Sequence, residues 1–113
     1  AEGVGITRPS DNWTKAKPQV GDAFTLPDQA LTTLAYYIRE KEGWVMGMSS
    51  MLNLAGALRT ALRSPKGSRI ATFLCDGGER ATGKMYNRAF LKEKNLDPTV
   101  VSDGELLKYF ESL

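Results

Sequence analysis

Apolar residues recur at helical spacing in two stretches of the chain. In the first stretch, positions i, i+3, i+4 and i+7 are all apolar: Leu31, Leu34, Ala35 and Ile38. The second stretch repeats the pattern: Met51, Leu54, Ala55, Leu58 and Leu62. Pro27 suits the entry to the first helix, Asp28 favours its N-terminus and Gly43 its end. Either Ser49 or Ser50 is suited to cap the second. The sequence therefore predicts two amphipathic helices.

Three short apolar runs between these stretches are typical of strands. They are Ala23–Leu26, Trp44–Met46 and Arg69–Cys75. The third is almost continuously apolar or β-forming, which is typical of a strand covered on both faces in a parallel sheet. The sequence Asp76-Gly77-Gly78 predicts a sharp loop directly after it.

The two ends of the chain complete the expected order of elements. The polar residues 1–21 predict extended or loop structure, and a helical stretch follows from about Thr82 to Lys94. Ser102 and Glu105 have the spacing of a capping box, which predicts a last helix to Leu113. The alternation of strands and helices predicts an α/β fold in one small domain, with parallel-type strands flanked by helices.

Composition narrows the classes of function. The net charge is +2 and the basic residues are scattered, which argues against a nucleic-acid partner and against a polybasic membrane anchor. No apolar run is long enough to span a bilayer. Histidine is absent, so the commonest general base and metal ligand is missing, and we expect no metal site. The single cysteine, Cys75, favours a reducing compartment, either the cytosol or an organelle matrix.

Three segments together resemble a known family. They are residues 2–8 (Glu-Gly-Val-Gly-Ile-Thr-Arg), residues 47–57 (Gly-Met-Ser-Ser-Met-Leu-Asn-Leu-Ala-Gly-Ala), and residues 72–80 followed by 84–87 (Thr-Phe-Leu-Cys-Asp-Gly-Gly-Glu-Arg, then Lys-Met-Tyr-Asn). In order and spacing they are similar to the C-terminal third of cysteine synthases and their cystathionine β-synthase relatives. Residues 1–113 therefore look like the C-terminal portion of such an enzyme.

The resemblance implies a pyridoxal 5'-phosphate (PLP) enzyme of fold-type II. Such enzymes replace the β-substituent of an activated serine, such as O-acetylserine, with sulfide or another thiol. The cofactor-binding lysine and the phosphate loop lie earlier in the family's chain and have no counterpart here, so no residue of this chain is assigned a catalytic role. The implied partners are a complementary N-terminal chain, an amino-acid substrate and a second copy of the completed enzyme.

The resemblance also implies site residues. Gly3 and Gly5 match a stretch that passes beside the cofactor, although simple turn geometry explains them equally well. Asp76 and Gly77 match the loop that faces the pyridine nitrogen. Ser49 and Ser50 begin a helix behind the cofactor, where helix capping comes first and contact with an anionic ligand second.

The chain departs from the family pattern at several positions. Gly77 stands where the family typically has serine or threonine, and Met51 replaces a common glycine. Residues 81–83 (Ala-Thr-Gly) replace an aromatic-and-polar triplet. These departures leave a second hypothesis open, namely a non-catalytic α/β binding or regulatory module derived from the family.

Overall fold

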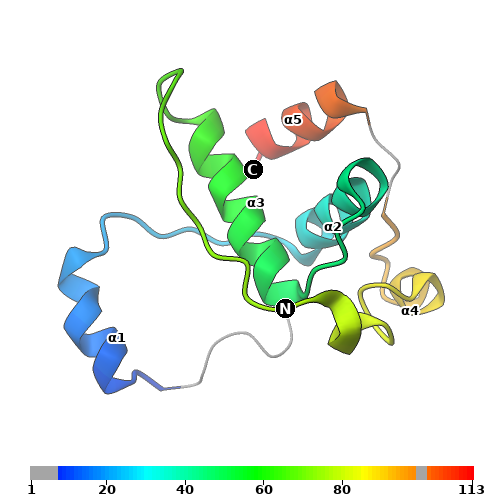
Figure 1. Cartoon of the computed structure of the whole chain (residues 1–113), viewed down its shortest axis with the longest axis horizontal. Coiled ribbons are helices and arrows are strands. Elements are labelled where there is room, and N and C mark those ends of the chain that lie inside the picture. The colour runs from blue at the N-terminus through cyan, green and yellow to red at the C-terminus, as the bar shows by residue number, and fades with distance from the viewer. Residues whose placement is uncertain (1–7, 99–101) are drawn as a thin grey trace.

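Figure 1 shows a computed structural model of the chain, which describes residues 8–98 and 102–113. The helices in these residues are α1 (Asp11–Ala16), α2 (Asp28–Glu42), α3 (Met48–Leu62), α4 (Arg88–Glu93) and α5 (Asp103–Glu111). Two 3-10 turns lie at Lys17–Gln19 and Gly78–Ala81. In Figure 1, α2, α3 and α5 form the body of the molecule, while α1 lies apart from it and buries none of its residues.

The two amphipathic helices are confirmed, and local chemistry explains most of their boundaries. Asp28 places a carboxylate in the first turn of α2, where it favours the positive end of the helix. Gly43 ends α2 in the left-handed conformation with φ 73°, and its N–H donates to the Arg39 carbonyl. The last helix also forms, because the Ser102 hydroxyl accepts from the Glu105 N–H as expected of a cap.

Two other predictions about helices need correction. Residues 82–86 form turns, and α4 begins only at Arg88, because the Asn87 side chain caps it by accepting from the Phe90 N–H at 3.2 Å. Near the N-terminus, the structure contains α1 where we expected loop structure. Its start is stabilised by Ser10, whose hydroxyl accepts from the Trp13 N–H.

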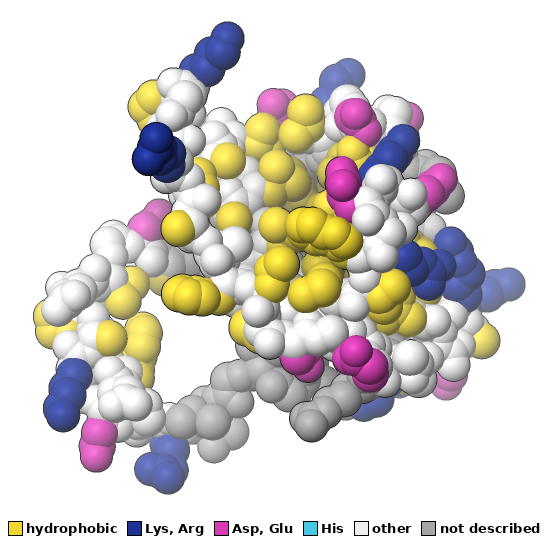
Figure 2. Space-filling model, in the orientation of Figure 1, with side chains coloured by type: hydrophobic (Ala, Val, Ile, Leu, Met, Phe, Trp, Pro, Cys, Tyr) yellow, Lys and Arg dark blue, Asp and Glu magenta, His cyan; other side chains and the backbone are white. Residues whose placement is uncertain are grey.

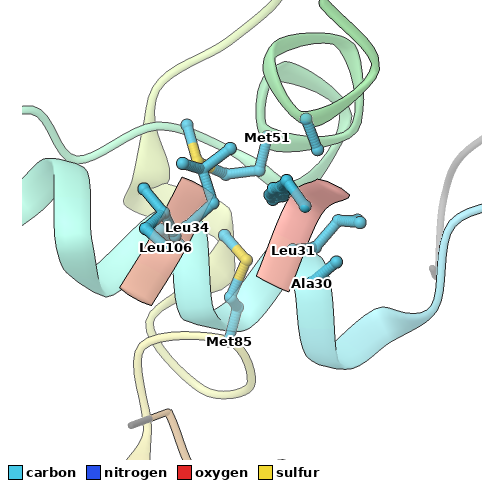
Figure 3. Close-up of a cluster of buried hydrophobic side chains, with 9 residues drawn as sticks. Ala30, Leu31, Leu34, Met51, Met85 and Leu106 are labelled. Atoms are coloured by element: carbon cyan, nitrogen blue, oxygen red, sulfur yellow. The ribbon is translucent and has the colours of Figure 1, made fainter. Parts of the chain in front are cut away.

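The hydrophobic core lies where α2, α3 and α5 meet. Figure 3 shows side chains from these helices converging with Met85, which follows the loop after Gly78. The buried cluster is Ala30, Leu31, Leu34, Ala35, Met51, Ala55, Met85, Leu106 and Phe110. Met51 is completely buried within it, so the residue that departs from the family pattern serves to pack α3.

The predicted α/β fold is wrong for the described residues, which contain no strand. Their one β-bridge is isolated and antiparallel, between Met46 and Gly77. The run Arg69–Cys75 is extended but lies along α3, where the Asn53 amide donates to the Phe73 carbonyl at 3.0 Å. A strand is stable only when its backbone groups pair with a neighbour, and no described segment supplies such pairing here.

The extended run is also exposed, contrary to a strand covered on both faces. The exposed fractions are 38% for Ile70, 81% for Phe73 and 44% for Leu74. The prediction of a buried strand over Arg69–Cys75 is therefore wrong in both its pairing and its burial. Among the described residues, no helix is long and apolar enough to cross a bilayer.

Candidate functional site

Two segments meet at the start of α3 and form the candidate site. We call residues 45–50 together with residues 75–78 the junction. The Gly47 N–H donates to the Asp76 carbonyl at 3.0 Å, and the Gly78 N–H donates to the Val45 carbonyl at 2.9 Å. The junction therefore fixes the loop after Cys75 against the entry to α3.

Ser50 is the central side chain of the junction. It is fully buried, and its hydroxyl donates to the Asp76 carbonyl at 3.0 Å. The same oxygen accepts from the N–H of Cys75 at 2.9 Å and from the N–H of Asp76 at 3.2 Å. One donation and two acceptances use the full capacity of a hydroxyl. Ser50 therefore holds the loop in place and has no bond left for a ligand.

Ser49 and Asp76 lie at the more open side of the junction. The Ser49 hydroxyl donates to the Asp76 carboxylate at 3.3 Å. No side chain makes a capping hydrogen bond at the start of α3, whose N-cap is Gly47. The predicted capping role of the two serines is thus wrong. The Asp76 carboxylate lies near the positive end of the helix, where negative charge is favoured.

Two glycines allow this close approach. A Cβ on Gly47 would lie 2.1 Å from the Asp76 Oδ1 atom, and a Cβ on Gly78 would lie 2.5 Å from Val45 Cγ1. A Cβ on Gly77 would lie 2.6 Å from the Glu79 Oε2 atom, which ends an exposed and flexible side chain. Gly78 is therefore required by packing, because backbone and side-chain atoms of Val45 lie against it, whereas at Gly47 and Gly77 the nearest atoms belong to exposed carboxylate side chains that can move.

Tyr86 supports the junction from outside the two segments. Its hydroxyl accepts from the Met46 N–H at 3.1 Å and donates to the Met46 carbonyl at 2.8 Å. Burial raises the pKa of this phenol above the ordinary 10.0, and the Met46 hydrogen bond opposes the shift. Sequence reasoning gave Tyr86 no role, although it lies in a segment that resembles the family.

The structure brings together four of the six predicted site residues. Ser49, Ser50, Asp76 and Gly77 all lie in the junction, although residues 49–50 and 76–77 are far apart in the sequence. Gly3 and Gly5 lie outside the described residues, so their proposed place beside a cofactor stays a prediction. Cys75 is exposed, and its sulfur accepts from the Asn53 amide at 3.5 Å.

Comparison with known proteins gives one consistent result. The chain is 39% identical to cysteine synthase 2 of Schizosaccharomyces pombe over 107 residues, which are 95% of this chain and 27% of that protein. It is 32% identical to the cysteine synthase of Dictyostelium discoideum over 95% of this chain and 28% of that protein. With cysteine synthase 1 of Neurospora crassa it shares 35% identity over 84% of this chain and 25% of that protein.

No protein-family model matches the chain, and no solved structure matches it significantly. The chain spans about a quarter of the length of the curated relatives it matches, so its homology is to a segment of a larger protein. From this homology, the chain belongs to the cysteine synthase family and corresponds to the C-terminal segment of such a protein.

Proposed function

We propose that this chain is the C-terminal part of a PLP-dependent, cysteine synthase-like enzyme. The completed enzyme replaces the β-substituent of an activated serine, such as O-acetylserine, with sulfide or a thiol. The observation that carries the proposal is the identity to cysteine synthases over nearly the whole chain. The junction supports it, because residues from two family-like segments meet at one helix start.

The chemistry of the junction fits a supporting role beside PLP. When bound, this cofactor withdraws electrons from the α-carbon of an amino acid, and it is held by a lysine. None of the junction residues is a lysine, and the family resemblance implies an attachment lysine earlier in the chain, so we assign the attachment point to the N-terminal part of the enzyme. Gly77 presents backbone without a side chain, and Asp76 adds a carboxylate next to it. These two residues would border the cofactor ring, and Ser49 would lie on the substrate side.

The exposed surface of the chain supports the proposal that an N-terminal part of the enzyme packs against it. Figure 2 shows hydrophobic side chains gathered on one face of the molecule among charged ones. Large apolar side chains that are exposed in the described residues include Phe24, Trp44, Val45, Ile70, Phe73 and Leu74. Exposed apolar surface on this scale is typical of an interaction site. The completed enzyme is proposed to form a homodimer, to act on a small amino acid, and to work in the cytosol or an organelle matrix.

The test compares this chain with the longer protein that also contains the lysine-bearing N-terminal part. We expect the longer protein to bind PLP and to form cysteine from O-acetylserine and sulfide. We expect the 113-residue chain to do neither. Turnover by the chain alone would contradict the split of the active site between the two parts.

The lack of a side chain at Gly77 favours a second candidate, a non-catalytic binding or regulatory module. In that case the longer protein would bind PLP or an amino acid without forming cysteine. The Gly77→Ser variant sharpens the distinction because it supplies the hydroxyl expected from the family resemblance. Cysteine formation by the longer protein with Gly77 in place would exclude the non-catalytic candidate.

A further inference from the structure

A cavity that shares Met48 with the junction opens between the start of α2, the start of α3 and the α4 region. Its volume is about 510 Å³, within the range of pockets that hold small molecules. The walls are mainly apolar: Leu31, Met48, Met85, Phe90, Leu91 and Leu96. Two of these are methionines, whose unbranched side chains adapt to ligands of different shape.

Positively charged side chains outnumber negatively charged ones around the cavity. Lys84 and Lys94 line it together with one carboxylate, that of Asp28. The Lys94 ammonium lies 5.9 Å from the centre of the Phe90 ring, so a cation stands beside an aromatic wall. Met48 is the first residue of α3, and the start of a helix carries partial positive charge. The balance at the cavity therefore favours a ligand that carries a negative charge.

We propose that this cavity binds small aliphatic carboxylates. The hydrocarbon part would lie against the leucine, methionine and phenylalanine side chains, and the carboxylate would face Lys94. This site does not depend on the proposed enzyme activity, because its lining shares Met48 with the junction but includes none of the predicted site residues.

Binding of octanoate to the 113-residue chain tests the proposal. In a two-dimensional NMR titration, we expect saturable shifts of the amide signals of α4 and of the start of α2. The uncharged analogue octanol and the cationic analogue octylammonium should bind more weakly. Lys94→Glu should weaken octanoate binding by roughly five-fold, because it replaces an attractive surface charge by a repulsive one.

Two matched variants test whether octanoate binds in this cavity or elsewhere on the chain. Lys92→Glu makes the same change of charge at a residue within α4 that does not line the cavity, whereas Lys94 directly follows α4, so Lys92→Glu should leave binding nearly unchanged. Phe73→Ser removes the most exposed of the large apolar side chains, and it should also leave the octanoate affinity unchanged. Equal losses for the two lysine variants, shifts centred on residues 69–75, or equal binding of octanol would each overturn the proposal.

Discussion

Ser50 shows what a single position can and cannot reveal in the sequence. A serine at the start of a helix predicts a cap. In the structure its hydroxyl instead binds backbone groups of Cys75 and Asp76, which lie about 25 residues further along the chain. Only the folded chain brings these amides to the helix. The position of Ser50 at the start of a helix was therefore predictable, but its hydrogen bonds to the distant loop were not.

Replacing Ser50 by alanine should destabilise the junction. The change leaves the N–H groups of Cys75 and Asp76 without this acceptor, while the Asp76 carbonyl keeps its hydrogen bond from the Gly47 N–H. A buried polar group left unpaired costs about 1–3 kcal/mol. We expect Ser50→Ala to lower the free energy of unfolding by about 2 kcal/mol in urea denaturation. Ser49→Ala is the matched control, with a loss under about 0.5 kcal/mol. Equal losses for the two variants would show that Ser50 does not hold the loop.

Tyr86 should make the free energy of unfolding fall as the pH rises into the alkaline range. Burial raises its pKa in the folded chain, so the unfolded chain loses the phenol proton first as the pH increases. The stabilisation is fully present below about 10 and is lost as the pH rises through the folded pKa. We expect Tyr86→Phe to make the alkaline fall in the free energy of unfolding less steep. A fall of unchanged slope in urea titrations would show that other groups cause it.

At the scale of elements, the two long amphipathic helices were predictable, whereas the short helix α1 was missed and the expected strands do not form. The periodic apolar positions of α2 and α3 specify helices that satisfy their own backbone groups. The run Arg69–Cys75 has the composition of a strand, but a strand needs partners that periodicity cannot supply. In the structure Asn53 holds this run along α3 instead. The local pattern therefore predicted a buried strand, whereas the folded chain leaves this segment unpaired with any strand and exposed.

The exposed side chains of the run Arg69–Cys75 should contribute to binding the N-terminal part more than to the stability of this chain. Phe73 is 81% exposed, so Phe73→Ser should change the free energy of unfolding of the chain by less than about 0.5 kcal/mol. We expect the same change to weaken binding to a separately produced N-terminal part in isothermal titration calorimetry. Lys66→Ser, in the nearby exposed turn, is the control and should leave binding unchanged. Unaltered binding by Phe73→Ser would remove this face from the proposed interface.

At the scale of the whole molecule, the core buries only some of the large apolar side chains in the sequence. The buried cluster joins α2, α3 and α5, while large apolar side chains such as Trp44, Ile70 and Phe73 stay exposed. The family resemblance predicted the incompleteness of the chain, and relatives about four times as long agree with it. The α/β prediction, which came from the alternation of apolar runs and helical stretches, is wrong because the described residues contain one isolated bridge and no strand from which a sheet could be built.

The most direct test of the split active site is the location of PLP in the longer protein. After reduction with borohydride and proteolysis, mass spectrometry identifies the peptide that carries the cofactor. We predict that PLP is attached to a lysine of the N-terminal part and to none of the lysines within this 113-residue chain. Attachment to a lysine of this chain, such as Lys84, would contradict the central claim that the chain completes a site built around another segment.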